Sequence, residues 1–329
     1  MNHQHLLFVE DLKTYFFTRN GVVKAVDGVT FHLDAGEALG LVGESGCGKS
    51  ITCHSIVRLL PTLGCRIVGG RILFEGEDLV SKNIKEMVKW RGKKIGMILQ
   101  DPLSSLNPVH TVGRQVGEAI RLDVKNGKIS AIKEKVLELL EKVKIPSAAK
   151  RMDQYPFQFS GGMRQRVLAA VSMARQPKLL IADEPTTALD VTIQDQFLRL
   201  LKQMQKEYGL ALLLVTHDLG LVAETCDRVA VMYAGKIVET GSVERVFENP
   251  AHPYTRALMM ALPDLGARKE RLFQITGEPP NLLNMPPGCA FSPRCDKTMD
   301  VCVKEYPPFV SAGDGSKAAC WLWAEGRVA

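Results

Sequence analysis

The chain has 329 residues, of which 46% are apolar and 24% charged, and its 42 lysines and arginines against 36 acidic residues give a net charge of +6. This apolar fraction excludes a mostly disordered chain, and the modest charge argues against a dedicated nucleic-acid binder. No apolar run reaches the roughly 18–20 residues that a bilayer crossing needs, and no secretory signal is evident at the N-terminus. We therefore expect a globular cytosolic protein of one large or two smaller domains.

Short aliphatic segments alternate with helical patterns over roughly the first 245 residues, which is typical of an α/β fold with a parallel sheet. Because a covered parallel sheet is buried on both faces, its strands lack polar alternation. The segments predicted as such strands are Leu39–Val42, Ile95–Leu99, Leu179–Ala182 and Leu212–Thr216.

Two helices are predicted from apolar stripes at helical spacing. One has Ser130 as its cap and ends near Pro146, and the other runs from about Val191 to Tyr208 with Gly209 as its stop. Their inward residues are Ile132, Val136, Leu139, Leu140 and Val143 in the first, and Ile193, Phe197, Leu200, Leu201 and Met204 in the second.

The order of these elements predicts the domain organisation. Residues from roughly 101 to 176 are helical without a clear core strand, which indicates an inserted helical subdomain. Val229–Tyr233 and Ile237–Thr240, joined through Ala234-Gly235-Lys236, predict a terminal hairpin. We place the α/β domain at residues 1–248.

Residues 249–329 differ in composition and are predicted to form a separate C-terminal module. Ten of the 17 prolines lie in Pro250–Pro308, and four of the eight cysteines lie between Cys289 and Cys320. Such a segment has little regular structure, so something other than a hydrophobic core is expected to hold it.

A glycine-rich segment, Gly43-Glu44-Ser45-Gly46-Cys47-Gly48-Lys49-Ser50, matches the phosphate-binding pattern G-x-x-x-x-G-K-[ST]. It follows a predicted strand and precedes a helical run, Ile51–Leu60, a context that argues against a turn without a ligand. Glycines let successive N–H groups face phosphates, while the lysine supplies a positive charge and the serine hydroxyl ligates Mg²⁺. The predicted nucleotide contacts here are Gly43, Ser45, Gly46, Cys47, Gly48, Lys49, Ser50 and Ile51.

A second constellation lies at the ends of the buried strands. Asp183 and Glu184 end the strand from Leu179, where the aspartate can hold Mg²⁺ and the glutamate can polarise an attacking water. Gln100 follows the strand from Ile95 and could reach the same metal, and His217 follows the strand from Leu212 and could contact a γ-phosphate.

A third feature is the segment Ser160-Gly161-Gly162-Met163-Arg164-Gln165, which precedes a helical stretch. The N–H groups and positive dipole end of that helix can face an anion. A lone glutamine or histidine at a strand end is more often structural, but the joint occurrence of these motifs in one order favours a functional interpretation.

Taken together, the motifs resemble those of the nucleotide-binding subunits of ABC transporters. The matched pieces are GESGCGKS, Gln100, FSGGMRQRV, LLIADEP, Ala188-Leu189-Asp190 and His217. The resemblance implies an ABC-type P-loop ATPase fold in which two subunits enclose two ATP molecules and hydrolyse them to ADP and phosphate.

The resemblance also implies roles for individual residues. Glu184 would be the general base, with Lys49 and His217 as further catalytic residues. Ser160, Gly161 and Gly162 would touch ATP held mainly by the partner subunit, and Asp190 would lie across the same interface. An aromatic residue on the early strand would stack on adenine, and of Tyr15, Phe16 and Phe17 the spacing favours Phe16. Met163 departs from the glutamine most common at its position, which leaves ATP binding unaffected.

Three further segments resemble the dipeptide/oligopeptide import branch of this family. They are SGGMRQRV, Asn249-Pro250-Ala251-His252-Pro253-Tyr254-Thr255 and PPGCAFSPRC. The branch implies a second ATPase subunit, a paralogue or a second copy, below two membrane-spanning permeases fed by an extracytoplasmic peptide-binding protein. The chain would then act peripherally at the cytoplasmic face of the membrane, with the helical subdomain beside Gln100 as its docking surface.

The four C-terminal cysteines, Cys289, Cys295, Cys302 and Cys320, have the spacing C-x5-C-x6-C-x17-C. Four thiolates suit tetrahedral Zn²⁺ or an iron–sulfur cluster. Structural zinc usually uses closely spaced cysteine pairs, so the wider spacing favours a cluster, and relatives with this tail resemble [4Fe–4S] carriers. Zinc and free thiols remain alternatives, and a structural role is favoured over a redox sensor.

Two other functions compete with the import ATPase. A soluble ABC protein acting on nucleic acid or ribosomes often has two cassettes or a long coiled coil, and this chain shows neither. A metal-binding tail that recognises nucleic acid, beside a degenerate nucleotide fold, is disfavoured by the intact Lys49, Asp183, Glu184 and His217. We therefore expect no nucleic-acid partner.

Overall fold

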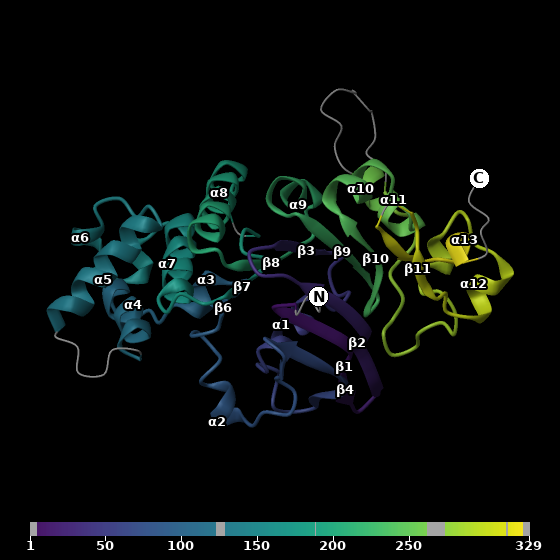
Figure 1. Ribbon diagram of the computed structural model, residues 1–329, viewed down its shortest axis with the longest axis horizontal. Coiled ribbons are helices and arrows are strands. Elements are labelled where there is room, and N and C mark those ends of the chain that lie inside the picture. The colour runs from purple at the N-terminus through teal and green to yellow at the C-terminus, as the bar shows by residue number, and fades with distance from the viewer. Residues whose placement is uncertain (1–4, 123–128, 188, 262–273, 314, 325–329) are drawn as a thin grey trace. The chain divides into compact units, whose positions relative to one another are not determined.

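The computed structural model describes residues 5–122, 129–187, 189–261, 274–313 and 315–324, and its elements are labelled in Figure 1. The chain divides into two compact units. Unit 1 consists of Met1–Asp34, Ala38–Ser81 and Thr216–Ala329, and unit 2 of Ala35–Glu37 and Lys82–Val215. Unit 1 therefore combines both ends of the chain.

Unit 1 contains an antiparallel sheet with strand order β2-β1-β4-β5. Its strands are β1 (Leu7–Thr18), β2 (Gly21–Leu33), β4 (Cys65–Phe74) and β5 (Glu77–Asp78). Buried and more exposed side chains alternate along most of β1, as expected for a strand with one covered face. The covered face of β1 includes Leu7, Val9, Leu12 and Thr14, each fully buried.

A second group of strands in unit 1 has the order β11-β12-β10-β9-β3. These strands are β3 (Ala38–Val42), β9 (Arg228–Tyr233), β10 (Lys236–Ser242), β11 (Phe309–Ser311) and β12 (Lys317–Ala319). β3 runs parallel to β9, and all five residues of β3 are buried, as predicted. The predicted β9–β10 hairpin is confirmed, and its turn residues Ala234 and Gly235 both have positive φ, at 46° and 83°.

The prediction that this hairpin is terminal is wrong, because β12 pairs antiparallel with β10 and β11 pairs with β12. An open strand edge presents unpaired N–H and C=O groups, and the C-terminal segment covers part of the β10 edge, at Glu239 and Thr240. The expectation of little regular structure there is also wrong for the described residues. They form α11 (Pro253–Met260), η2 (Ser292–Arg294), α12 (Asp300–Lys304) and α13 (Trp321–Ala324), drawn from light green to yellow in Figure 1.

The remaining helices of unit 1 are α1 (Lys49–Ile56), α9 (Leu219–Thr225) and α10 (Val243–Glu248). The predicted helix to Leu60 is too long, since α1 ends at Ile56. Arg58, two residues later, has a φ of 55°, in the left-handed region that a right-handed helix cannot contain.

Unit 2 contains three parallel strands in the order β8-β7-β6. They are β6 (Ile95–Ile98), β7 (Leu179–Asp183) and β8 (Ala211–Thr216), and every residue of β7 and β8 is buried. α8 (Val191–Tyr208) connects β7 to β8 with the predicted bounds. Asp190 caps it, and Gly209, with φ 60°, ends it as predicted.

Between β6 and β7 the described residues carry helices and no strand, as the sequence predicts. The helices are α3 (Pro102–Ser105), α4 (Val112–Arg121), α5 (Ile129–Lys142), α6 (Ala148–Arg151), η1 (Pro156–Gln158) and α7 (Gly161–Met173), with α2 (Ile84–Met87) preceding β6. Ser130 does not cap α5, because it already lies in the helix after Ile129. The predicted apolar stripe of this helix is otherwise confirmed: its residues are buried except for Leu139, which is partly exposed.

Among the described residues, no helix is both long and apolar enough to span a membrane.

Candidate functional site

The glycine-rich loop joins β3 to α1 in unit 1, as the motif predicts. Gly43, Gly46 and Gly48 have φ of 155°, 78° and 110°. A Cβ at Gly43 would overlap the carbonyl oxygen of Met232, and one at Gly48 would overlap that of Ala25. These two glycines are therefore required by close backbone packing as well as by conformation, whereas a Cβ at Gly46 would meet open space.

Lys49 is the first residue of α1, and its ammonium group turns back over the loop. Its Nζ donates to the carbonyl oxygen of Gly43 at 2.8 Å and to that of Glu44 at 3.0 Å. Ser50 and Ile51 follow in the first turn of the helix, where backbone N–H groups lack intrahelical partners. The loop therefore presents a cation and helix N–H donors together, the combination that binds phosphate groups.

The residues in the middle of the glycine-rich loop differ from one another in solvent exposure. Ser45 and Gly46 are exposed, whereas Cys47 is 5% exposed and its Sγ lies 3.9 Å from the Lys49 Nζ. Burial raises the pKa of the Cys47 thiol. Cys47 therefore fills space under the loop, as expected for a small apolar side chain.

Three aromatic side chains on β1 compete for the role of adenine contact, and two have other partners. The Tyr15 hydroxyl donates to Asp27 Oδ1 at 2.6 Å, and the Phe17 ring lies 4.3 Å from the guanidinium carbon of Arg66. Phe16 is partly exposed, and the pairing of β1 with β2 is irregular between Thr14 and Phe16. The Thr14 hydroxyl is 2.8 Å from that of Ser55, so β1 packs against α1, the helix that follows the loop.

In unit 2, Gln100 and Glu184 are brought together although 84 residues separate them. Gln100 Nε2 donates to Glu184 Oε2 at 2.9 Å, and the Thr187 hydroxyl donates to the same oxygen at 3.2 Å. Asp183 precedes Glu184 as the last residue of β7 and is 2% exposed. The predicted metal ligand Asp183, the predicted base Glu184 and Gln100 thus meet at the carboxyl end of parallel strands.

The backbone of Glu184 is strained, because its φ of 43° lies in the left-handed region, which costs a non-glycine residue on the order of 1 kcal/mol. Its N–H donates to the carbonyl oxygen of Val215 at 2.9 Å, which holds this conformation at the end of β8. Such strain is typical of residues that a fold positions for chemistry.

The predicted contacts to a partner subunit's ATP also lie in unit 2. Ser160 caps α7, and its hydroxyl accepts a hydrogen bond from the Met163 N–H at 3.3 Å. Gly161 and Gly162 form the first turn, and a Cβ at Gly162 would collide with Ile193 on α8. Small residues therefore leave the amino end of α7 open and let α8 pack closely against it.

The remaining predicted residues have simpler surroundings. Asp190 Oδ1 accepts from the Ile193 N–H at 3.0 Å and so caps α8. Ala188 lies outside the described residues. His217, in unit 1, is exposed and directly follows β8, and Asp218 after it caps α9.

The four C-terminal cysteines line one pocket in unit 1. Burial raises the pKa of the Cys289 thiol and that of the Cys320 thiol to about 11 each. Over the described part of the chain, only His5, His32 and Asp34 form a group whose metal-ligating atoms all lie within 4.8 Å of one another. No three of the cysteine sulfurs are therefore that close together.

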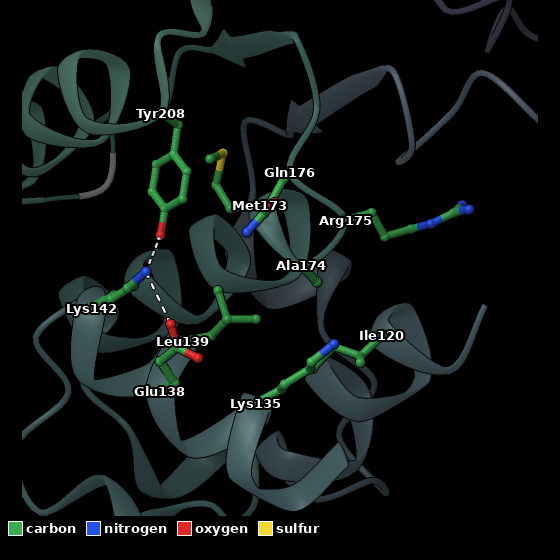
Figure 2. A pocket seen from close by; sticks show the side chains of 10 residues that line it. All are labelled: Ile120, Lys135, Glu138, Leu139, Lys142, Met173, Ala174, Arg175, Gln176 and Tyr208. Atoms are coloured by element: carbon green, nitrogen blue, oxygen red, sulfur yellow. Dashed lines mark hydrogen bonds and ion pairs between the residues drawn. The ribbon is translucent and has the colours of Figure 1, made fainter. Parts of the chain in front are cut away.

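A separate hollow in unit 2 lies among α4, α5, α7 and α8 (Figure 2). Lys142 points across it, with its Nζ 2.6 Å from the Tyr208 hydroxyl and 3.1 Å from Glu138 Oε1. The hydrogen bond to Tyr208 raises the pKa of Lys142. None of the predicted nucleotide contacts lines this hollow, and its polar contacts tie α5 to α8.

Sequence reasoning missed the surroundings of Glu44, the second residue of the glycine-rich loop. Its N–H donates to the Tyr254 hydroxyl at 2.9 Å, and its carboxylate pairs with Arg294 at 2.7 and 3.0 Å. Both partners lie more than 200 positions away, and no local pattern in the sequence connects them with the loop.

Comparison with known families and proteins identifies the chain. The family described as ABC transporter matches residues 26–187, and the Oligopeptide/dipeptide transporter, C-terminal region, matches residues 238–302. A probable peptide ABC transporter ATP-binding protein of Sinorhizobium fredii is 50% identical over 96% of this chain and 94% of its own length. The dipeptide transport ATP-binding protein DppD of Bacillus subtilis is 49% identical over 97% and 95%.

Solved structures agree with this fold. The structure of cbiO1 from Clostridium perfringens, part of an ABC transporter complex, has a TM-score of 0.64 and 29% identity over 74% of this chain and 91% of that one. A dimeric ATP-binding cassette bound to ADP and Pi has a TM-score of 0.65 at 24% identity, covering 72% and 98%, which supports the fold alone. The chain therefore belongs to the ATP-hydrolysing subunits of the ABC transporter family, in its oligopeptide/dipeptide branch.

Proposed function

We propose that this ATPase drives the import of dipeptides or oligopeptides through two membrane-spanning permease subunits, with an extracytoplasmic binding protein delivering the peptide. The observation that carries this proposal is the C-terminal match over residues 238–302, a region named for oligopeptide and dipeptide transporters. The cassette itself occurs in transporters of many substrates, so the substrate class follows from the C-terminal region.

The proposed membrane partnership can be tested by purifying the tagged full-length chain from native membranes in mild detergent. Two permeases and an ABC ATPase subunit should co-purify, and ATP hydrolysis by this complex should rise when binding protein and peptide are added. Recovery of the chain with ribosomes or nucleic acid, and without permeases, would contradict the proposal. The chain would then be a soluble ABC protein that acts on nucleic acid or ribosomes.

For the ATP site, we assign the phosphate contacts to the loop from Gly43 to Ser50 and the adenine contact to Phe16. Lys49 offsets the charge of the β- and γ-phosphates. Ser50, Gln100 and Asp183 would hold Mg²⁺, which neutralises charge that develops on the phosphates during hydrolysis. The oxygen ligands they offer, a hydroxyl, an amide and a carboxylate, suit this hard cation.

Glu184 is the proposed general base. Gln100 and Thr187 donate to its Oε2 and so orient the carboxylate that would accept a proton from the attacking water. His217 is assigned to the γ-phosphate. Ser160, Gly161, Gly162 and Asp190 would act on ATP bound mainly by the partner subunit, with the amino end of α7 directed at its phosphates.

For the C-terminal cysteines, we propose a [4Fe–4S] cluster that holds the segment in shape. Four thiols that line one pocket supply the full ligand set of such a cluster. The wide spacing of the four cysteines along the chain, without the closely spaced pairs typical of structural zinc sites, favours the larger group over a single Zn²⁺ ion.

Metal analysis of anaerobically purified protein tests the cluster. Iron and acid-labile sulfide are each expected at about four per chain, in a brown protein. A Cys302→Ser variant should lose iron, whereas Cys65→Ser, outside the pocket, should keep it. Colourless protein with one zinc per chain would decide for the alternative metal, and metal-free protein would decide for free thiols.

A further inference from the structure

Arg294, in the cysteine-bearing C-terminal segment, is paired with the phosphate-binding loop. Its Nη1 lies 2.7 Å from Glu44 Oε2 and its Nη2 lies 3.0 Å from Glu44 Oε1, a bidentate arrangement across 250 residues of sequence. The Arg294 side chain is only 4% exposed and that of Glu44 25%. Charge pairs this well shielded from water are stronger than surface ion pairs.

The guanidinium of Arg294 has a partner for each of its five N–H donors. Besides Glu44, it donates to the Tyr233 hydroxyl at 3.3 Å and to the carbonyl oxygens of Thr276 at 3.1 Å and Ile275 at 3.4 Å. A cation with every donor satisfied is fixed in position and orientation. Arg294 is therefore a rigid support for the carboxylate that it contacts.

Glu44 is held at its backbone as well as its side chain. Its N–H donates to the Tyr254 hydroxyl at 2.9 Å, and its carbonyl oxygen accepts from Lys49 Nζ at 3.0 Å. Tyr254 packs against Tyr233 and Phe291, with ring centroids 4.5 and 5.3 Å apart. The shape of the loop near its cationic lysine thus depends on contacts from two residues beyond position 250.

A carboxylate in a phosphate-binding loop is electrostatically unfavourable for the ligand. Two like charges held close together at a protein surface repel each other more strongly than they would in bulk water. Arg294 offsets the charge of Glu44 in a largely shielded ion pair. Without this partner, Glu44 would be an uncompensated anion in the segment that has to receive phosphate groups.

We infer that Arg294 is a positioning residue for ATP binding: it holds Glu44, and through it the glycine-rich loop, in the conformation that accepts the triphosphate. The inference rests on the proposed role of this loop in ATP binding. Arg294 does not touch the reacting atoms, so its contribution is to nucleotide affinity rather than to the chemical step.

The test compares Arg294→Gln, Glu44→Gln and the double variant in the full-length chain, with ATP affinity measured by calorimetry and hydrolysis by steady-state kinetics. Arg294→Gln should raise the Kd and the KM for ATP by about tenfold or more, because one partner of a shielded charge pair is lost. Its kcat should stay within about twofold. The double variant should return to within about threefold of the parent, since neither charge is then left unpaired.

Arg256→Gln is the matched control, because Arg256 is an exposed arginine on α11 in the same segment. It should leave both ATP parameters unchanged. A merely structural role for Arg294 would lower thermal stability and kcat together and would not be rescued by Glu44→Gln. Unchanged affinity in Arg294→Gln, or absence of rescue in the double variant, overturns the inference.

Should Arg294→Gln fail to fold, Arg294→Lys decides the question. Lysine keeps the charge but cannot form the bidentate contact, so a rise in the KM for ATP of about threefold to tenfold is expected, and an unchanged KM overturns the inference. Failure of the proposed function would look different: the parent chain itself would then bind no ATP.

Discussion

At the residue scale, the geometry around Glu184 is the most informative part of the chain. Glu184 has a strained backbone whose N–H donates to the carbonyl oxygen of Val215 on β8, and one oxygen of its carboxylate accepts from both Gln100 and Thr187. Gln100 and Thr187 therefore fix the orientation of the carboxylate. This arrangement supports the proposed role of Glu184 as general base, and the substitution Glu184→Gln tests that role.

Glu184→Gln is expected to retain ATP binding and to slow hydrolysis by about 10²-fold or more, the contribution typical of a general base. Glutamine has the same size and can still accept from Gln100, but it cannot take a proton from water. Glu207→Gln on the surface of α8 serves as the control and should hydrolyse ATP normally. Hydrolysis at a near-parental rate in Glu184→Gln would remove Glu184 from the role of base.

Phe16 permits a second prediction at this scale. Phe16→Ala should raise the KM for ATP by about fivefold or more, because stacking of a base on an aromatic ring contributes about 1–3 kcal/mol. Tyr15→Phe removes only the hydroxyl that donates to Asp27 and should leave the KM unchanged. Steady-state kinetics with ATP measure both variants, and an unchanged KM in Phe16→Ala would remove Phe16 from the adenine contact.

At the element scale, the two helices that carry the residues proposed to contact a partner subunit's ATP begin with side-chain caps. Ser160 caps α7 and Asp190 caps α8, and Gly162 lets the two helices approach each other. A cap satisfies N–H groups that the helix leaves unpaired and directs the chain at the helix entrance. The same residues are thus both structural and candidates for contact with nucleotide.

The capping role of Asp190 can be measured locally. Asp190→Ala should cost about 1 kcal/mol at the start of α8, so the amide of Ile193 should exchange its hydrogen about fivefold faster. Asp195→Ala, which removes an exposed ion pair with Arg199 in the same helix, is the control and should leave that amide unaffected. Unchanged protection of Ile193 in Asp190→Ala would mean that Asp190 contributes no cap in solution.

At the scale of the whole molecule, the C-terminal segment is built into the same unit as the phosphate-binding loop. β12 extends the strands at β10, and the buried carboxylate of Glu239 on β10 accepts from the N–H groups of Ala251 and His252 at 2.7 and 2.8 Å. Unit 1 therefore contains the glycine-rich loop, the strand β1 with its aromatic side chains, and the four C-terminal cysteines. This connection is the structural basis of the proposed effect of Arg294 on nucleotide binding.

The proposed pairing of two cassettes also belongs to this scale. If ATP is hydrolysed between two subunits, specific activity should fall as the isolated chain is diluted below its dimerisation constant. Activity at each concentration should be compared with the mass of the protein from light scattering. A full specific rate in demonstrably monomeric protein would contradict the shared site.

Much of this protein could be predicted from the sequence because the determining interactions are local. The glycine-rich loop, the bounds of α8 between Asp190 and Gly209, the buried strands and the β9–β10 turn each depend on residues a few positions apart. Hydrophobic periodicity, caps and positive-φ glycines act within one element. The motifs also identified the ABC ATPase and its peptide branch, which the comparisons confirm.

Only the tertiary structure decided the contacts between distant segments. Gln100 meets Glu184 across 84 residues and Arg294 meets Glu44 across 250, and the pairing of β12 with β10 corrected the expectation of a terminal hairpin. Such contacts depend on how strands and helices are placed relative to one another in the folded chain. A sequence pattern specifies which side chains face the core, but not which distant partner each will meet there.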